Sequence, residues 1–488
     1  MPGLIFVLAV AASLSVTWGV LEAMPHLEDE FAQYFQAQVF ASGRLWVPSP
    51  PQPASFLVPF AIDLDGRRFS KYPPGLAAVL ALGLKAGASW LINPLAGALT
   101  LLVLYVLGRE LFDAETGPPV HGVSAALLGL LSPMFLGLSA TLLPHALCAL
   151  CLLVFTWAVV QISRFTFHVS SFKFHVSIIG GLALGWAVLT RPYTALAYAA
   201  PFGLWAAWQI ARGRRPAAAG AYAVMGLIAA AFAALLLVYN HALTGQYRTE
   251  LYTLVWPYDR MGWGGGLYPG GHTLRVALMN ARLDLWVTLT ELLGWPRLSW
   301  LPLLLGLILP PRRRVEWALL APFGALVLAQ IAYWSHGAPL FGPRYYYEAM
   351  PLLWLLAARG LLKLWHLLAG HTKARALMAV ALAVVVAVDV LGVLPARFAV
   401  WRGLHGITRQ PRRQIAQQGL HNALVFVRIR HWGDYSELAW TNELSLDGDL
   451  VFALDEGEEA NRAVVAAYPG RHVFNLADGV LTEVKEEP

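Results

Sequence analysis

His26-Leu27-Glu28-Asp29-Glu30 follows the first apolar segment of the chain, and Lys71-Tyr72-Pro73-Pro74-Gly75 closes the polar stretch that it opens. Three adjacent carboxylates at the mouth of a membrane helix are costly unless they face water or hold another group. We therefore expect the loop over residues 24–91 to lie outside the membrane and to be the chemical end of a membrane enzyme.

The composition is that of a membrane protein. Of the 488 residues, 58% are hydrophobic and only 13% are charged, and the mean hydropathy is +0.56. A soluble domain carries about 25% charged residues, roughly twice this share. The net charge of +6 arises from short basic clusters between apolar segments, which indicates positive-inside anchoring rather than nucleic-acid binding. Cys148 and Cys151 lie in one apolar segment and predict neither a disulfide framework nor a metal site.

Apolar segments that approach the roughly 20 residues needed to span a bilayer recur along the chain. They cover residues 4–22, 92–110, 119–137, 144–163, 176–190, 193–211, 217–239, 297–310, 315–334, 346–363 and 375–394. Residues 74–90 are apolar too, but treating them as a juxtamembrane helix keeps the later basic clusters on one side. The sequence thus predicts an all-α polytopic protein with about eleven spans, a cytoplasmic N-terminus and an outer C-terminus.

Two regions outside the spans have their own character. Residues 240–296 form a second long outer loop, whose glycines at 262, 264, 265 and 266 indicate irregular backbone, although residues 283–294 allow an interfacial helix. After the membrane part (1–395), charged residues become frequent, and residues 396–488 predict a small extracytoplasmic α/β domain. Its expected strands are 423–429, 450–454 and 471–474, with a helix at 457–467. The domain lacks a nucleotide-binding glycine pattern, so we expect it to bind or to act as a lid.

The carboxylates near residue 28 begin a predicted amphipathic helix. Asp29, Gln33 and Gln36 would share one polar face, opposite an apolar stripe that lies at the membrane interface. Asp29 or Glu30 then fits a general base or a substrate clamp. The acids equally fit a structural role at the positive end of a helix dipole, and Glu28 favours that role.

Cations on the outer side run against the positive-inside trend and favour an anionic partner. Lys71 precedes a rigid Pro-Pro turn, and Arg344 in Gly342-Pro343-Arg344-Tyr345 suits phosphate recognition. For Arg191 a snorkelling role at the lipid headgroups is as good an interpretation. His145 follows Pro144 at the start of a span, where a lone histidine is more often structural. No His/Cys pair has ligand spacing, and the acidic trio could hold a divalent ion only with outside help, so no metal or other cofactor is expected.

In these features the chain resembles the GT-C glycosyltransferases, in the bacterial branch grouped with protein O-mannosyltransferases and the lipid A aminoarabinose transferase. The Asp29-Glu30 pair, Lys71-Tyr72-Pro73-Pro74-Gly75 and Gly342-Pro343-Arg344-Tyr345 carry the resemblance, which covers about residues 1–395. It implies a GT-C-like enzyme of the cell membrane that moves a hexosyl or pentosyl group from a polyprenyl-phosphate donor, with inversion. The acceptor would be an extracytoplasmic lipid, glycan or protein.

The resemblance also implies roles for single residues. Asp29 would be the catalytic base, with Glu30 beside it, but Glu28 departs from the simple Asp-Glu pattern and leaves the choice of base open. The residues expected to bind phosphate or substrate are Lys71, Tyr72, His145, Arg191, Asp259, Arg344 and Tyr345.

Two other classes of protein fit the composition. A transporter or flippase of a lipid-linked or anionic substrate would need ionisable residues in mid-membrane, and Asp389 is the main one in the predicted spans. A receptor could use the C-terminal domain but would not need polar outer loops.

Overall fold

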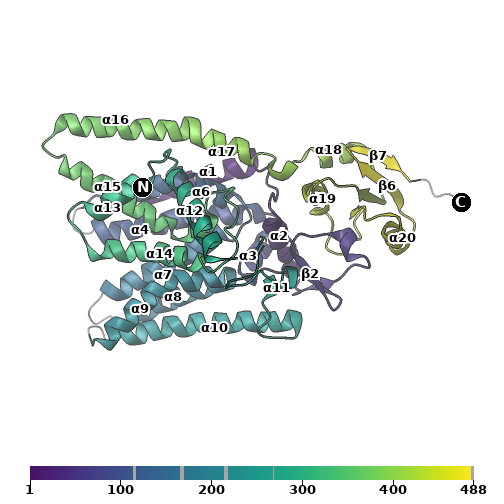
Figure 1. The fold of residues 1–488 in the computed structure, drawn as a ribbon, viewed down its shortest axis with the longest axis horizontal. Coiled ribbons are helices and arrows are strands. Elements are labelled where there is room, and N and C mark those ends of the chain that lie inside the picture. The colour runs from purple at the N-terminus through teal and green to yellow at the C-terminus, as the bar shows by residue number, and fades with distance from the viewer. Residues whose placement is uncertain (114–116, 165–169, 214–217, 267–268, 485–488) are drawn as a thin grey trace. The chain divides into compact units, whose positions relative to one another are not determined.

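The computed structural model describes residues 1–113, 117–164, 170–213, 218–266 and 269–484. It divides into two compact units (Figure 1). The helical unit comprises Met1–Val16, Leu91–Leu237 and Pro257–Ala399, and the mixed unit comprises Thr17–Trp90, Val238–Trp256 and Val400–Pro488. The predicted architecture, mostly helical with a small sheet region at the C-terminus, is confirmed.

Helices make up the ordered elements of the helical unit within the described ranges. In chain order they are α1 (Pro2–Gly19), α4 (Ile92–Gly108), η3 (Arg109–Asp113), α5 (Val120–Leu131), α6 (Pro133–Ala140), α7 (His145–Arg164), α8 (Ser170–Thr190), α9 (Pro192–Ala211), α10 (Ala219–Thr244), α12 (Leu274–Glu291), α13 (Trp300–Ile308), α14 (Arg314–Gln330), η5 (Arg344–Ala349), α15 (Met350–Leu367), α16 (Thr372–Val388), η6 (Asp389–Val393) and α17 (Leu394–Trp401). The last residues of α1, α10 and α17 belong to the mixed unit.

Five helical segments of the described chain are long and apolar enough to cross a membrane. They are Pro2–Gly19, Ser89–Asp113, His145–Ser163, Ala219–Thr244 and Thr372–Gly406. Some of the other predicted spans correspond to shorter helices, such as the nine-residue α13. The count of about eleven therefore stays a prediction.

The predicted span 119–137 is not one straight helix. It is broken into α5 and α6, which are bent by 67°. Pro133 begins α6, and the preceding Ser132 has an extended backbone, because a proline disfavours the helical conformation of the residue before it. With α5 and α6 taken as one broken span, the structure has up to six candidate spans.

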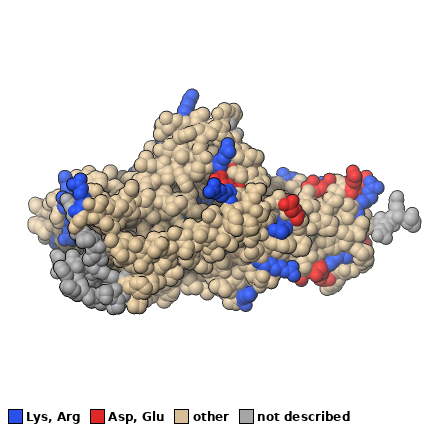
Figure 2. Space-filling view, turned by 90° about the horizontal axis from the view of Figure 1, so that it is seen from below, with Lys and Arg blue, Asp and Glu red and all other residues tan. Residues whose placement is uncertain are grey.

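The helices of this unit pack closely where small residues meet. A Cβ atom added to Gly181 of α8 would lie 2.9 Å from the carbonyl oxygen of Met225 in α10, and one added to Gly185 would overlap the Phe232 ring. Glycine thus lets the two helices approach, as is usual between membrane helices. Figure 2 shows a wide surface over the helices that is almost free of charged side chains, as expected for a face turned toward lipid.

The mixed unit contains two sheets and the helices around them. Its elements are α2 (Glu28–Ala41), β1 (Val47–Pro48), η1 (Pro53–Phe56), β2 (Ala61–Leu64), β3 (Arg67–Ser70), α3 (Pro74–Lys85), η2 (Ser89–Leu91), α11 (Leu251–Val255), η7 (Leu404–Gly406), α18 (Gln410–Gln417), β4 (Ala423–Val427), α19 (Trp432–Ala439), β5 (Leu450–Leu454), α20 (Glu458–Ala467), β6 (His472–Ala477) and β7 (Val480–Glu483). The predicted helices near Glu28 and at 74–90 are confirmed as α2 and α3.

A three-stranded sheet in the first outer loop was not predicted. Its order is β1-β3-β2, and β2 and β3 form an antiparallel hairpin. The hairpin turns at Asp65 and Gly66, both with positive φ (50° and 74°), which is the geometry that an Asp-Gly pair favours. Strand β3 ends at Ser70, so Lys71 directly follows the hairpin.

The C-terminal sheet has the order β5-β4-β6-β7. Strand β4 is buried along its whole length and pairs in parallel with β5 and β6, so it forms the centre of this small domain. The three predicted strands and the helix at 457–467 are confirmed, while α19 and β7 were not predicted.

The prediction that 240–296 is one long loop is wrong in part. Helix α10 extends to Thr244, and α11 and α12 occupy much of the rest. Thr273 caps α12 by accepting a hydrogen bond from the Val276 amide, so this helix begins at Leu274, nine residues before the interfacial helix allowed by the sequence. Of the glycine-rich part, residues 267 and 268 lie outside the described residues.

Candidate active site

The start of α2 is organised by Glu30 rather than by Glu28. The Glu30 carboxylate accepts hydrogen bonds from the backbone amides of His26 (2.9 Å) and Leu27 (3.1 Å), which close a capping box. Glu30 is only 1% exposed. Glu28 is the first residue of α2, in the turn where the sequence analysis expected it, but Glu30, the third residue, is the one that reaches back to the preceding amides.

Asp29 contacts the second predicted site segment. The Tyr72 hydroxyl donates a short hydrogen bond to the Asp29 carboxylate, joining the first turn of α2 to the residue after Lys71. Asp29 is half-buried, so its carboxylate is held in one direction while remaining partly accessible. That is the placement a general base needs.

Glu28 lies in the same electrostatic neighbourhood. Burial raises the pKa of the Glu28 carboxyl above its usual value, the Asp29 carboxylate raises it further, and the Lys71 ammonium opposes both. The acidic pair and the lysine are thus close enough to influence one another.

Lys71 is enclosed by aromatic rings. Its ammonium lies 3.8 Å from the centre of the Phe60 ring, 4.6 Å from Trp256, 5.2 Å from Tyr252 and 5.4 Å from Tyr72. The residue is 3% exposed. Ring faces stabilise a desolvated cation, and the surrounding low dielectric strengthens its attraction for an anion.

The polar face of α2 fixes the chain just before this lysine. Gln36 accepts a hydrogen bond from the Ser70 amide (2.8 Å) and donates one to the Leu45 carbonyl (3.0 Å). Ser70 in turn accepts from the Tyr72 amide. The predicted polar stripe therefore positions the Lys71 segment.

The opposite face of α2 is covered by the chain itself. Phe31 packs with Met24 and Ile407 and meets Trp432 edge-to-face, and Phe35 packs with neighbouring apolar side chains of the same unit. The prediction that this stripe lies on the membrane interface is wrong, because the C-terminal domain and strands β1 and β2 supply apolar partners for it.

A second cluster lies in the helical unit around Glu348. The fully buried Glu348 carboxylate accepts a hydrogen bond from Arg191 (2.6 Å) and contacts His145 Nδ1 at 3.1 Å. Arg191 precedes Pro192 at the start of α9, His145 begins α7, and Glu348 lies in η5, directly before α15. The cluster therefore joins the starts of α7, α9 and α15. The charge of Arg191 is balanced by Glu348, a partner that the sequence analysis did not single out.

Arg344 and Tyr345 border this cluster. The Tyr345 ring lies under both guanidinium groups, 5.2 Å from Arg191 and 5.7 Å from Arg344, and it stacks on His145. Arg344 also donates a hydrogen bond to the Gly337 carbonyl. Both Arg344 and Tyr345 are half-buried, so an anion can reach the guanidinium.

Asp259 is held by the segment that leads to Tyr345. Its carboxylate accepts hydrogen bonds from the Tyr333 hydroxyl (2.5 Å) and the Trp334 indole (3.0 Å), and it is 3% exposed. Tyr333 also packs against Tyr345 at 6.0 Å. Asp259 thus joins the Arg344 neighbourhood through aromatic side chains.

The structure therefore groups the predicted site residues into two sets. In the mixed unit Asp29, Lys71 and Tyr72 meet, and Glu30 closes the capping box of the helix that carries Asp29. The helical unit holds the second set, which consists of His145, Arg191, Arg344, Tyr345 and Asp259. The participants that sequence reasoning missed are Phe60, Tyr252, Trp256, Tyr333, Trp334 and Glu348. Among the described residues, no group of three or more His, Cys, Asp and Glu is placed to hold a metal ion.

Neither a family model nor a curated protein sequence matches the chain. Two solved structures of ArnT from Cupriavidus metallidurans are similar to it in structure. The one bound to undecaprenyl phosphate is 18% identical, with 96% of this chain and 89% of that chain covered and a TM-score of 0.54. The apo structure is 16% identical, with 97% and 93% covered and a TM-score of 0.55. The chain thus has the fold of ArnT, and the resemblance found in the sequence is confirmed at the level of the fold.

Proposed function

We propose that the chain is an integral-membrane glycosyltransferase that moves a sugar from a polyprenyl-phosphate donor to an extracytoplasmic acceptor. The observation that carries the proposal is a carboxylate and a cation held next to each other in one loop. Tyr72 donates a hydrogen bond to the Asp29 carboxylate, and the residue before it, Lys71, supplies the cation enclosed by aromatic rings. The fold adds support, since ArnT, which shares it over most of both chains, has been solved with undecaprenyl phosphate bound.

The chemistry follows from those two groups. Asp29 accepts the proton of the acceptor hydroxyl as its oxygen attacks the anomeric carbon. The bond from that carbon to the phosphate oxygen breaks, and the polyprenyl phosphate leaves with the negative charge. Lys71 stabilises this growing charge in a site of low dielectric. A single displacement of this kind inverts the anomeric centre. Tyr72 orients the Asp29 carboxylate through its hydrogen bond.

The helical unit supplies further proposed ligands. Arg344 is the better phosphate ligand there, because Arg191 is committed to Glu348. We assign Arg191 and His145 to holding the η5 turn, and with it Tyr345, in position.

The remaining assignments rest on the sequence. We assign the protein to a cell membrane, with about eleven spans, a cytoplasmic N-terminus and an extracytoplasmic domain at 396–488. The first outer loop (24–91) and the region 240–296, which contains α11 and α12, then lie on the side where lipid-linked sugars are used. Asp259 contacts the sugar, and the reaction needs no metal ion. The transferred group is a hexose or a pentose.

One observation favours transport or flipping of a lipid-linked or anionic substrate instead. Asp389 is fully buried at the π-helical turn η6 of a candidate span, and its carboxylate oxygens form no hydrogen bond within the described part of the chain. Ionisable groups so placed mark transport pathways in other membrane proteins.

The two functions separate in a reconstituted assay. The protein in proteoliposomes is given synthetic polyprenyl-phosphate hexoses and pentoses and a membrane extract as acceptor, and released polyprenyl phosphate is measured by mass spectrometry. The proposal expects release that Asp29→Asn abolishes and the matched control Asp65→Asn, exposed in the β2–β3 turn, leaves unchanged. Lipid translocation without release of polyprenyl phosphate would overturn it.

A further inference from the structure

Helix α12 carries polar side chains on its buried side and apolar ones on its exposed side, the reverse of a helix that faces water. Its buried polar residues are Asn280, Asp284, Thr288 and Glu291. Its large exposed apolar residues, each 42–58% exposed, are Leu274, Leu278, Met279, Leu283 and Trp286. The proposed transfer reaction uses neither set.

The buried side of α12 is fixed by hydrogen bonds within the helical unit. The Asn280 side chain donates to the Trp334 carbonyl (3.4 Å), and the Glu291 carboxylate accepts from Arg397. These contacts decide which side of the helix faces the protein, so the residues opposite point away from it. We call that side the outer face of α12, and its residues are Leu274, Arg275, Leu278, Met279, Arg282, Leu283 and Trp286.

The outer face forms one continuous strip along the helix. Leu278, Arg282 and Trp286 follow one another at intervals of four residues, and Met279 and Leu283 lie beside them. Yet α12 is not among the helices of the described chain that are long and apolar enough to cross a membrane. A helix that does not span but exposes an apolar strip is suited to lie along a bilayer surface.

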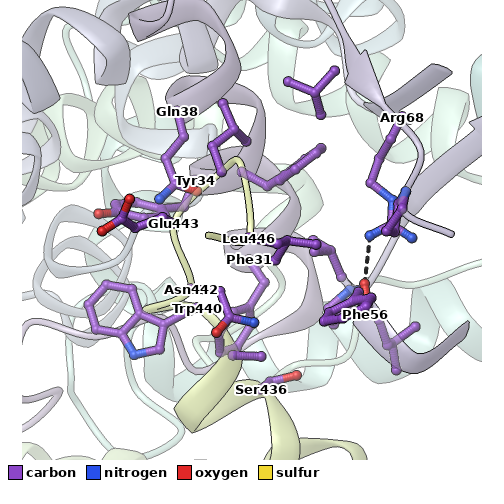
Figure 3. Close-up of a pocket in the computed structure, with 18 of the residues that line it drawn as sticks. Phe31, Tyr34, Gln38, Phe56, Arg68, Ser436, Trp440, Asn442, Glu443 and Leu446 are labelled. Carbon is purple, nitrogen blue, oxygen red and sulfur yellow. Dashed lines mark hydrogen bonds between the residues drawn. The ribbon is translucent and has the colours of Figure 1, made fainter. Parts of the chain in front are cut away.

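The apolar face of α2 shows, by contrast, how this protein covers such a strip with its own chain. In Figure 3, Phe31 lies among side chains of the same unit that include Tyr34, Phe56 and Trp440. Phe31 is 4% exposed, whereas the apolar residues of the outer face of α12 are at least 42% exposed. A partner from outside the chain therefore has to cover them.

The charges on and beside the outer face point to an anionic partner. Arg275 and Arg282 are exposed, and they lie on the same side of the helix because they are seven residues apart. Arg297 extends its guanidinium over the Trp286 ring, 5.8 Å from the ring centre. The acidic residues of α12 are both buried on the opposite side. A second copy of the chain docked through the same face would bring like charges together.

We propose that the outer face of α12 lies on the bilayer surface and binds anionic phospholipid head groups. The guanidinium groups pair with lipid phosphates, and the leucine, methionine and tryptophan side chains enter the boundary between head groups and acyl chains. A neutral bilayer would cover the apolar residues without balancing the charge of the arginines. The binding does not depend on the proposed transfer of a sugar.

Site-directed fluorescence on the full chain in lipid nanodiscs tests the position of the helix. Met279→Cys and Leu283→Cys each receive an environment-sensitive NBD label, and Ser445→Cys, exposed in the C-terminal domain, is the matched control. The unsubstituted chain gives the background, since Cys148 and Cys151 are both buried. Lipids with a doxyl quencher in the acyl chain are expected to quench the two α12 labels, and aqueous iodide is expected to quench the control label.

The choice of head group is tested with the label on Leu283→Cys. Doxyl-labelled phosphatidylglycerol is expected to quench it more strongly than doxyl-labelled phosphatidylcholine, since each basic residue near the surface favours an anionic lipid by up to about fivefold. Arg275→Gln combined with Arg282→Gln is expected to remove most of this preference. Arg312→Gln combined with Arg314→Gln, exposed elsewhere in the helical unit, is the matched control and is expected to keep it.

Other results would overturn the proposal. Quenching of the α12 labels by iodide and not by doxyl lipids would show that the outer face meets water. Protection from both quenchers would show that another protein, or a second copy of the chain, covers it. Equal quenching by the two doxyl lipids, or a preference that survives the change of both Arg275 and Arg282, would exclude binding of anionic head groups by this face.

Discussion

Replacing Lys71 by glutamine removes a cation that is 3% exposed and enclosed by four aromatic rings. A unit charge about 4 Å from a phosphate at an effective dielectric of about 20 contributes roughly 4 kcal/mol. If the leaving phosphate gains that stabilisation as its charge develops, the transfer rate falls about 10³-fold in the variant. Lys71→Arg restores the charge, but its larger planar group does not fit the ring enclosure, so we expect only partial recovery.

The assay is single-turnover release of polyprenyl phosphate from donor-loaded proteoliposomes. Lys85→Gln is the matched control, because Lys85 is exposed at the end of α3. Lys71→Gln should lower the rate of the chemical step rather than only the affinity for the donor. A wild-type single-turnover rate in Lys71→Gln would refute the assignment of the lysine to the leaving phosphate.

The remaining predictions concern stability. Glu348→Gln should destabilise the protein by about 3–5 kcal/mol, seen as a lower Tm in detergent, because it leaves the Arg191 charge buried without a counter-charge; an unchanged Tm would contradict this. Glu30→Ala should cost about 1–3 kcal/mol by leaving two amides unpaired, and increased hydrogen exchange at the start of α2 would report it. Burial raises the pKa of Glu437 from 4.5 to about 7, so the folded state holds a proton that the unfolded chain releases. Stability should fall as pH rises from about 4.5 to 7, by at most about 3 kcal/mol, and Glu437→Gln should flatten this Tm profile; parallel profiles would contradict the pKa shift.

Local patterns predicted local structure well. The polar stripe of Asp29, Gln33 and Gln36 predicted α2, and the Pro-Pro start predicted α3, because helical period and proline geometry act over a few residues. The β2–β3 hairpin carried an equally local signal in Asp65-Gly66, so this element could have been predicted.

Side-chain partners far apart in sequence could not be predicted. The enclosure of Lys71 uses Tyr252 and Trp256, about 180 residues away, and the Arg191–Glu348 pair is separated by 157 residues. Spacing along the chain carries no information about such contacts, which depend on how the helices pack. The capping hydrogen bonds of Glu30 could not be predicted for a smaller reason: three acids lie in the first turn, and only the exact start of the helix decides which one reaches the free amides.

The apolar stripe of α2 shows how one pattern fits two environments. A stripe of this kind is equally suited to a membrane interface and to a protein core. The choice depended on the C-terminal domain, whose Trp432 and Ile407 cover Phe31. Neither segment alone predicts that the first loop and the C-terminal domain share one apolar core.

The central claim is tested most directly by Asp29→Asn in reconstituted protein, with transfer and lipid binding measured on the same sample. The variant keeps the shape of the side chain and the partner for Tyr72 but loses the proton acceptor. We expect transfer to fall by about 10²–10⁴-fold, the usual contribution of a general base, with undecaprenyl phosphate binding and Tm unchanged. Transfer at the wild-type rate would contradict it.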